Sequence, residues 1–402
     1  MATPESVVIV GAGMAGANAA FTLRKLGYDG RVVLVGAENS IAYERPPLSK
    51  DYLRGESPIE KAYVKPASDY DEQRIEFLRG RTAHALNVAE KRVDLDDGSS
   101  LPYGALVLST GSEPRRLEVA GAELPNVRYL RTIADSDGIR AAAEKAESVA
   151  VVGGGWIGSE VAASLRQLGH SVTLVSRTAR PLEKVLGTEI AEVYRQLHVE
   201  RGTRIATGSV SSIDPGFVNL DDGTRLPADL VVVGVGAVPR TALAKNAGLK
   251  MRDRAVEVDE LLATSAPDVY AIGDIASAWH PRLGRPVRIE HLDNAKQQGR
   301  AVAATILGQG KPYVRTPYFY SDQFDLGMEY RGFAPTWDEV VVRGDVAARS
   351  FDAFWLADGR VIAGMNANRW DDGDELLAIV EAGAVVDPVR LGDPNVKLAE
   401  AA

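Results

Sequence analysis

One stretch of this chain occurs twice. Residues 95–102 read LDDGSSLP, and residues 220–227 read LDDGTRLP. Upstream of the two copies lie two further matching segments, VVIVGAGMAG at 7–16 and VAVVGGGWIG at 149–158. Downstream, matching residues continue in the same order: Val107, Gly111 and Pro114, then Val232, Gly236 and Pro239. The repetition predicts one supersecondary module used twice in a single chain.

The first module combines a buried strand, a glycine turn and a helix. Gly11 permits the tight turn, Gly13 lets the backbone approach a pyrophosphate, and Gly16 lets the helix pack closely on the strand. The free N–H groups at the start of that helix can bind phosphate. Glu38, after the second strand, can accept both hydroxyls of an adenosine ribose. The expected elements are a strand at 7–10, a helix to Leu26 and a strand at 32–35.

The second module repeats this order with Gly153, Gly155 and Gly158. Two such units predict two dinucleotide sites. The LDDG segments are then expected to form a small antiparallel extension of each unit, leading into the closing strands ALVLSTG and LVVVGVG. The expected elements of the second copy are a strand at 149–152, a helix to about Leu168 and a strand at 172–175.

Composition narrows the class of protein. A chain of 402 residues, 45% hydrophobic and 25% charged, is long enough for two or three domains. No apolar run reaches the roughly 18 residues of a membrane span, and the first residues, MATPES, do not resemble a signal peptide. We therefore expect a soluble, cytoplasmic protein without a membrane partner. The net charge of −9 argues against nucleic acid as a partner.

A third glycine motif, VYAIGDIAS at 269–277, lies outside the repeat. A strand that ends in Gly-Asp would place Asp274 at the carboxyl edge of a sheet. There its carboxylate can hold a ribityl hydroxyl, and the adjacent backbone can hold a phosphate. A simple turn at the end of a strand is the alternative interpretation.

Several motifs in this order resemble those of the FAD-dependent ferredoxin reductases. The family includes reductases of the putidaredoxin reductase and biphenyl-dioxygenase type and is related to apoptosis-inducing factor. The motifs are GAGMAG, YERPPLSK at 43–50, STGSEPR at 109–115, GGGWIGSE at 153–160, AIGDIAS, and PYFYSDQFDLGMEYRGF at 317–333. The resemblance covers essentially the whole chain. It implies FAD on the first module, a nicotinamide coenzyme on the second, and a C-terminal domain that receives a small iron–sulfur protein.

The implied fold is α/β, with two nested Rossmann-like nucleotide-binding domains of the glutathione-reductase type and a C-terminal α+β domain. The expected ranges are 1–115 with 244–314 for FAD, 116–243 for NAD(P), and 315–402 for the C-terminal domain. The resemblance also implies a set of FAD-binding residues: Gly11, Gly13, Ala15, Gly16, Glu38, Arg45, Lys50, Ala83, Thr110, Gly111, Arg131, Asp274, Leu292 and Tyr320. Three of these depend on alignment alone and are otherwise ordinary strand or loop residues: Ala83, Arg131 and Leu292.

Lys50 and Glu160 are the expected catalytic residues, as an ion pair beside the N5 edge of the flavin. A solvated loop lysine and a carboxylate favoured by the helix dipole are the alternatives. The expected NAD(P)-binding residues are Gly153, Gly155, Ile157, Gly158, Glu160, Ser176, Arg177, Arg180 and Gly236.

The chain contains no cysteine. This excludes a redox-active dithiol or a cysteine nucleophile, so electrons that reach a flavin must leave directly for an external acceptor. We therefore expect an NAD(P)H-dependent ferredoxin reductase that feeds an oxygenase such as a cytochrome P450, without a metal site of its own. The alternatives are a quinone reductase and a redox-gated interaction protein similar to apoptosis-inducing factor. Docking of an acidic ferredoxin is expected to involve Arg288, Lys296, Arg300, Arg331 and Arg343.

The sequence also predicts the coenzyme. An NAD-binding unit usually ends its second strand with an acidic residue, but here that position is Ser176. Arg177 and Arg180 follow, and guanidinium groups can bind a 2′-phosphate. Arg180 has a counterpart in NADH-using relatives, so Ser176 and Arg177 are the informative residues. We expect NADPH to be accepted and preferred, with NADH still usable; the oligomeric state is not predicted.

Overall fold

The computed structural model of the protein describes residues 3–401, which form two compact units. The first contains residues up to Arg45 together with Ile59–Glu113 and Val238–Pro317. The second contains Pro46–Pro58, Pro114–Ala237 and the residues from Tyr318 onward. The segment Pro46–Pro58 therefore belongs to the second unit, although it lies inside the range 1–115. Two of the changes from one unit to the other fall within the short paired strands β8 (Ser112–Pro114) and β17 (Ala237–Pro239).

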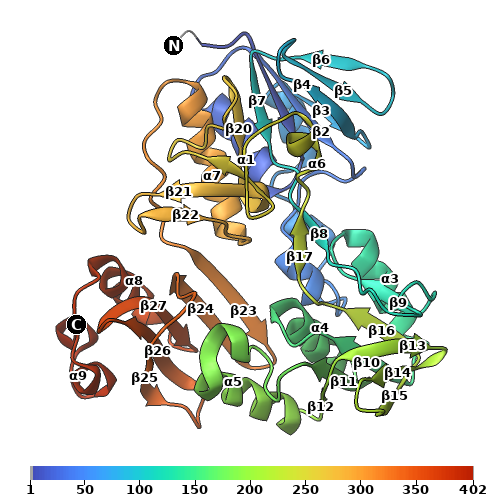
Figure 1. Cartoon of the computed structure of the whole chain (residues 1–402), viewed down its shortest axis with the longest axis vertical. Helices are drawn as coiled ribbons and strands as arrows, with labels where there is room; N and C mark the ends of the chain where they lie inside the picture. The colour runs from blue at the N-terminus through green and yellow to red at the C-terminus, as the bar shows by residue number, and fades with distance from the viewer. Residues whose placement is uncertain (1–2, 402) are drawn as a thin grey trace. The chain divides into compact units, whose positions relative to one another are not determined.

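A five-stranded parallel sheet forms the centre of the first unit, with its strands in the order β20-β7-β1-β2-β3 (Figure 1). Residues 7–10 of the middle strand, β1 (Ser6–Val10), are at most 4% exposed. Such β-branched residues suit a strand that is buried on both faces. The other strands are β2 (Arg31–Gly36), β3 (Ile75–Arg79), β7 (Ala105–Leu108) and β20 (Val269–Ala271).

Two long helices of this unit, α1 (Met14–Lys25) and α7 (Leu292–Ile306), pack against each other. A side chain at Gly299 would place its Cβ only 2.4 Å from the carbonyl oxygen of Ala15. Glycine at this position therefore permits the close approach. The first unit also contains α2 (Ala67–Glu72), α6 (Ala242–Asn246) and a four-stranded sheet of β18 (Met251–Arg252), β19 (Ala255–Val258), β21 (Ala276–His280) and β22 (Arg285–Val287).

The second unit contains a second five-stranded parallel sheet, in the order β12-β11-β10-β16-β9. Its strands are β9 (Val127–Tyr129), β10 (Ser148–Val152), β11 (Ser171–Ser176), β12 (Arg204–Thr207) and β16 (Leu230–Val233). Its helices are α3 (Ile133–Ala143), α4 (Trp156–Gln167) and α5 (Glu183–Glu200). The predicted strands and helices of both modules are thus present within one or two residues of their expected bounds.

The repeated LDDG segment forms the same structure in both copies. Each lies in a three-stranded antiparallel sheet, and the strand that follows, β7 or β16, pairs with the first strand of its module. Gly98 and Gly223 take the same left-handed backbone conformation, with φ of +83° and +87°. The duplication predicted from the sequence is confirmed. The strands are β4 (Ala83–Asn87), β5 (Arg92–Leu95) and β6 (Ser100–Pro102), and β13 (Val210–Asp214), β14 (Gly216–Leu220) and β15 (Arg225–Ala228).

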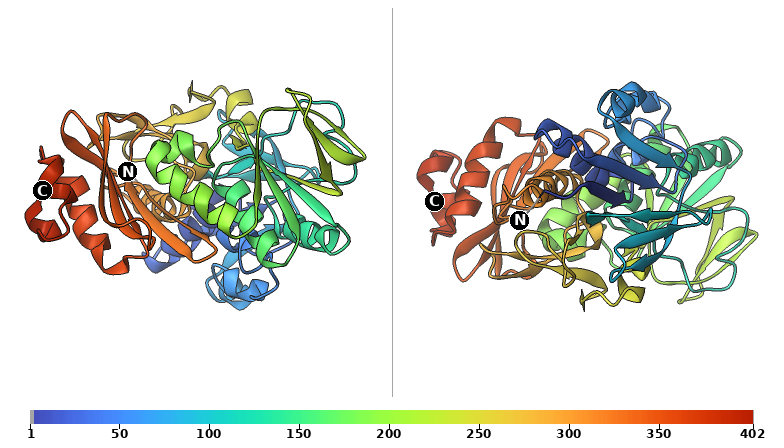
Figure 2. Two further views of the ribbon diagram at one scale, coloured as in Figure 1. Left: turned by 90° about the horizontal axis from the view of Figure 1, so that it is seen from below. Right: turned by 90° about the horizontal axis from the view of Figure 1, so that it is seen from above.

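Residues from Tyr318 onward form an antiparallel sheet in the order β23-β24-β27-β26-β25. One face packs on α5, where the Trp355 indole N–H donates to the carbonyl of Leu186 at 3.2 Å. The other face packs on short C-terminal helices, so that α5 (green) and these helices (red) lie on opposite sides of the sheet (Figure 2). The elements are β23 (Tyr318–Gln323), β24 (Leu326–Gly332), β25 (Glu339–Asp345), β26 (Ser350–Ala357), β27 (Arg360–Ala367), α8 (Gly373–Ala382), α9 (Pro388–Gly392) and α10 (Leu398–Ala401).

Arg343 on β25 fixes the segment that follows α9. Its side chain is buried, and its guanidinium donates to the carbonyl oxygens of Leu391, Asp393 and Val396. Five N–H donors in a planar fork suit a cluster of backbone acceptors. Arg343 therefore has a structural role, and its expected role as an exposed docking residue is wrong.

We expect Arg343→Met to lower the free energy of unfolding by about 2–4 kcal/mol, because these carbonyl groups lose their charged donor. Chemical denaturation followed by tryptophan fluorescence would measure the change. Arg360→Met is a matched control, since Arg360 is exposed and donates to one carbonyl, that of Gly383. The control should lower the free energy of unfolding by less than about 1 kcal/mol. Equal losses of stability in both variants would contradict the structural role of Arg343.

Candidate functional site

The first glycine turn connects β1 to α1 and has no room for side chains at two of its three glycines. A Cβ at Gly11, whose φ is +112°, would lie 2.1 Å from the carbonyl oxygen of Ser109. A Cβ at Gly16 would lie 2.0 Å from the carbonyl oxygen of Gly11. At Gly13, in contrast, a Cβ would meet no atom within 4 Å. The turn is therefore closed toward the protein and open at its middle glycine.

The second turn, between β10 and α4, has the same geometry. A Cβ at Gly153 or at Gly158 would lie 2.3 or 1.9 Å from a backbone carbonyl oxygen, whereas the space at Gly155 is open. Within residues 3–401, neither α1 nor α4 has a side-chain cap, since their N-cap residues are Gly13 and Gly155. Backbone N–H groups at both helix starts are thus available to an anion such as a pyrophosphate. Both turns fit a dinucleotide.

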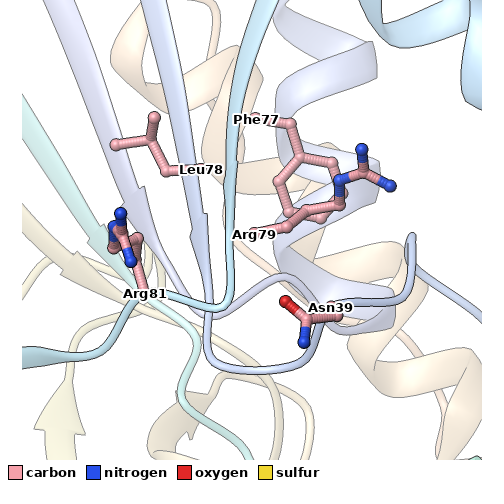
Figure 3. Close-up of a pocket in the computed structure, with 5 residues that line it drawn as sticks. All are labelled: Asn39, Phe77, Leu78, Arg79 and Arg81. Carbon is pink, nitrogen blue, oxygen red and sulfur yellow. The ribbon is translucent and has the colours of Figure 1, made fainter.

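The carboxylate of Glu38 lies just beyond the carboxyl end of β2. One oxygen accepts a hydrogen bond of 2.6 Å from the Tyr43 hydroxyl, and the other lies 3.2 Å from the Arg45 guanidinium. These contacts orient the carboxylate and leave lone pairs on both oxygens for ribose hydroxyls. The next residue, Asn39, lines a hollow of about 530 Å³ together with Phe77, Leu78, Arg79 and Arg81 (Figure 3). Neither arginine was expected at a site, because each comes from the end of a strand with no recognisable motif.

Other residues of the expected FAD set lie at the same edge of the first sheet. Thr110 and Gly111 follow β7, and the Thr110 hydroxyl donates to the carbonyl of Arg240 at 2.5 Å. Asp274 follows β20 in a short turn whose Gly273 N–H donates to the Gln298 side chain at 2.7 Å. Because these strands and β1 are parallel neighbours, their carboxyl ends meet at one edge, where α/β sheets bind ligands.

The expected set is divided between the two units. Gly11, Gly13, Ala15, Gly16, Glu38, Arg45, Ala83, Thr110, Gly111, Asp274 and Leu292 belong to the first unit, with Ala83 at the start of β4 and Leu292 at the start of α7. Lys50, Arg131 and Tyr320 belong to the second.

Lys50 and Glu160 form a buried ion pair within the second unit. Lys50 Nζ lies 2.9 Å from Glu160 Oε2, and their side chains are 10% and 4% exposed. Lys50 follows the short helix η1 (Pro46–Ser49), and Glu160 lies on α4. The ammonium group is also 5.5 Å from the centroid of the Tyr320 ring. The expected pair is therefore present, and the alternative of a solvated loop lysine does not hold.

Two serines that the motifs did not single out complete the surroundings of this pair. The Ser49 hydroxyl donates to Glu160 Oε2 at 2.5 Å, and the Ser321 hydroxyl donates to Glu160 Oε1 at 2.7 Å. A buried carboxylate needs such donors in addition to its counter-ion. Ser49 directly precedes Lys50 in the motif YERPPLSK, and this adjacency was the only sequence feature that could have pointed to Ser49.

The end of β11 contains the residues expected to select the coenzyme. Ser176 is 6% exposed, and a Cβ at Gly154 would lie 2.6 Å from its hydroxyl oxygen, so Ser176 lies against the glycine turn. Arg180 is engaged by Glu183 and Glu192, at 3.3 and 2.9 Å. Hydrogen bonds from Arg195 and, to a smaller extent, Arg180 lower the pKa of Glu192 to about 2. Arg177 is exposed and makes no ion pair with another described residue.

The remaining NAD(P) residues lie at the same sheet edge or on α4. Ile157 is 46% exposed at the start of α4. Gly236, after β16, has a φ of +106° and accepts a hydrogen bond of 2.9 Å from the Arg115 N–H. Among the docking candidates, Arg288 pairs with Glu290, Arg300 is exposed, and Lys296 is half-buried on α7. Arg331 is 12% exposed and bonds Glu329 and Asn366, each at 2.8 Å.

Two absences apply to residues 3–401. No group of histidine, aspartate and glutamate side chains there could hold a metal ion. No helix in that part of the chain is long and apolar enough to cross a membrane.

Known proteins resemble this chain along nearly its whole length. Residues 5–299 match the family described as pyridine nucleotide-disulphide oxidoreductase, and residues 318–402 match the reductase C-terminal family. Putidaredoxin reductase of Pseudomonas putida is 38% identical over 98% of this chain and 96% of its own length. The ferredoxin reductase subunit of 5,5′-dehydrodivanillate O-demethylase of Sphingobium sp. is 41% identical over 98% of this chain and 97% of its own.

The fold is also that of a solved relative. The crystal structure of the covalent putidaredoxin reductase–putidaredoxin complex contains a chain that superimposes with a TM-score of 0.94 and 38% identity, covering 98% of this chain and 97% of that chain. The nested nucleotide-binding domains and the C-terminal domain expected from the sequence are therefore confirmed. The chain therefore belongs to the pyridine nucleotide-disulphide oxidoreductase family and also has a reductase C-terminal domain.

Proposed function

We infer that this protein is a flavoprotein ferredoxin reductase. It takes hydride from NAD(P)H onto FAD and passes single electrons to a small iron–sulfur ferredoxin, which supplies a cytochrome P450 or another oxygenase. The observation that best supports this function is the duplicated glycine turn, which is closed toward the protein and open at Gly13 in one copy and at Gly155 in the other. Two dinucleotide sites in a chain without cysteine require an external electron acceptor. We place the reaction in the cytoplasm, where NAD(P)H is supplied.

We assign FAD to the first unit and the coenzyme to the parallel sheet of the second. The N–H groups at the start of α1 would hold the FAD pyrophosphate, and Glu38 would hold the adenosine ribose. When bound, FAD accepts a hydride and releases electrons one at a time, which is chemistry that the cofactor performs itself. The protein holds the reactants in place, and we propose that the charge of Lys50, fixed by Glu160, lies beside the flavin ring.

The identity of the electron acceptor can be tested directly. We expect at least one purified [2Fe-2S] or [3Fe-4S] ferredoxin to be reduced with a far higher kcat/KM than ubiquinone in the same steady-state assay. Ferredoxin reduction should also weaken with ionic strength if charged side chains steer docking. Efficient reduction of ubiquinone with no ferredoxin active would instead support a quinone reductase.

The ion pair is tested by Lys50→Met and by the double variant Lys50→Met/Glu160→Gln. The single variant leaves a buried carboxylate unpaired and is expected to lose stability, whereas the double variant removes both charges and should fold. In the double variant we expect flavin reduction by NAD(P)H to slow by at least about tenfold with FAD still bound, because a fixed charge near the reacting atoms is lost.

A control for this test is Lys91→Met. Lys91 forms an ion pair of 2.7 Å with Asp268, but both side chains are exposed. The control should reduce its flavin at the wild-type rate. An unchanged flavin spectrum and an unchanged rate in the double variant would show that the pair has no part in hydride transfer.

We also propose that NADPH is preferred. Ser176 supplies no carboxylate to repel a 2′-phosphate, and Arg177 is the exposed cation beside it, since Arg180 is already paired with two carboxylates. One charge-assisted contact of about 1.5–3 kcal/mol corresponds to a preference of roughly 10- to 100-fold. Measurements of kcat/KM for both coenzymes, in wild type and in Ser176→Glu/Arg177→Thr, should show the preference reversed in the variant. A wild-type preference for NADH above tenfold would overturn the assignment.

A further inference from the structure

Behind Glu160, a chain of buried polar side chains extends away from Lys50 within the second unit. The Ser321 hydroxyl, which donates to Glu160, lies 3.4 Å from Nε2 of Gln323. Oε1 of Gln323 lies 2.9 Å from Nε2 of His198, and Nδ1 of His198 lies 3.4 Å from the Thr203 hydroxyl. All of these side chains are at most 4% exposed. The chain joins β23, the last turn of α5 and the N-terminal half of α4.

With the Gln323 amide oriented as in the structure, the hydrogen bonds in this chain run in one direction. Ser321 gives its single hydroxyl proton to the carboxylate of Glu160, so its oxygen must accept from the amide NH₂ of Gln323. The amide oxygen of Gln323 then faces His198, which must donate from Nε2. Burial lowers the pKa of His198 and so favours the neutral ring. The single proton of a neutral ring belongs on Nε2, because Nε2 faces the amide oxygen of Gln323. Nδ1 is then free to accept from Thr203.

The opposite tautomer of His198 would reverse this arrangement. A proton on Nδ1 would leave Nε2 as an acceptor, and Gln323 would have to turn its NH₂ group toward the ring. Its amide oxygen would then compete with Glu160 for the Ser321 proton. The ring of His198 therefore determines whether Ser321 donates to Glu160.

The hydrogen bond from Ser321 also fixes the orientation of the Glu160 carboxylate. Ser321 holds Oε1 of Glu160, which leaves Oε2 to accept from Ser49 at 2.5 Å and to pair with Lys50 at 2.9 Å. Without Ser321, Oε1 would lose its protein donor, and the group could rotate about its last bond. Lys50 would then lose its fixed partner atom.

We propose that Ser321 is a positioning residue for hydride transfer, acting through Glu160 on Lys50, and that Gln323 and His198 hold it in its donating orientation. This inference rests on the proposed role of the Lys50–Glu160 pair. It assigns to the C-terminal domain a part in flavin reduction, because β23 contributes both Ser321 and Gln323.

The main test compares Ser321→Ala with Ser159→Ala in FAD-loaded protein. Ser159 is the residue before Glu160, and its buried hydroxyl has no hydrogen-bond partner among the described residues, so the control removes the same atom nearby. In single-turnover flavin reduction, Ser321→Ala should lower the limiting rate by about tenfold or more, with the coenzyme Kd unchanged. Ser159→Ala should match wild type, and Ser321→Thr, which keeps the hydroxyl, should recover most of the rate.

A mutant cycle identifies the ion pair through which Ser321 acts. In the Lys50→Met/Glu160→Gln background, which removes both buried charges, Ser321→Ala should add little further loss, because the carboxylate it orients is absent. If Lys50→Met/Glu160→Gln slows flavin reduction but Ser321→Ala in the wild-type background does not, the inference alone is overturned. If Lys50→Met/Glu160→Gln itself reduces flavin at the wild-type rate, the proposed role of the ion pair fails as well. Equal losses in Ser321→Ala and Ser159→Ala would also overturn the inference.

A spectroscopic readout does not depend on turnover. Nitrogen NMR of the holoenzyme labelled with ¹⁵N-histidine reports the tautomer of each of its five histidines, and loss of signals in His198→Phe assigns this residue. The neutral form with the proton on Nε2 is expected. A neutral ring with its proton on Nδ1 would reverse the direction of the chain and overturn the inference, even if Ser321→Ala cannot be folded.

Discussion

A carboxylate that is only 4% exposed must have its charge and its lone pairs satisfied by the protein, and for Glu160 this requirement connects three distant parts of the chain. Lys50 and Ser49 come from the segment Pro46–Pro58, Glu160 from α4, and Ser321 from β23. The contacts explain why a segment that follows the first module in sequence belongs to the second unit. They also tie the C-terminal sheet to the start of the helix that follows the second glycine turn.

The two modules show which constraints are local. Gly16 and Gly158 each lie where a Cβ would meet the carbonyl oxygen of the first glycine of its own turn. Such a contact spans five residues, so a short motif predicts it, and the strands, helices and LDDG turns of both copies agree with the sequence. Glu38 is similar, because its place after β2 follows from the strand–helix–strand order.

Other features depend on contacts between residues far apart in sequence. Ser321 meets Glu160 across 161 positions, and His198 meets Gln323 across 125. No periodicity or spacing could predict these pairs. The role of Arg343 could not be predicted from the sequence either, because an arginine on a strand can face solvent or the protein. Its acceptors come from the folded segment after α9. The Lys50–Glu160 pair was predicted through family resemblance, and the serines that orient it became visible only in the structure.

This protein takes two electrons at once from NAD(P)H and passes them singly to a ferredoxin. An anaerobic titration with catalytic amounts of the FAD-loaded protein, a defined amount of NADPH and excess ferredoxin would measure this ratio, with the coenzyme and the cluster followed by their separate absorbance changes. Because a hydride delivers two electrons and the cluster accepts one, we expect two ferredoxins to be reduced for each NADPH oxidised. Oxidation of NADPH without reduced ferredoxin, or no oxidation until a quinone is added, would contradict it.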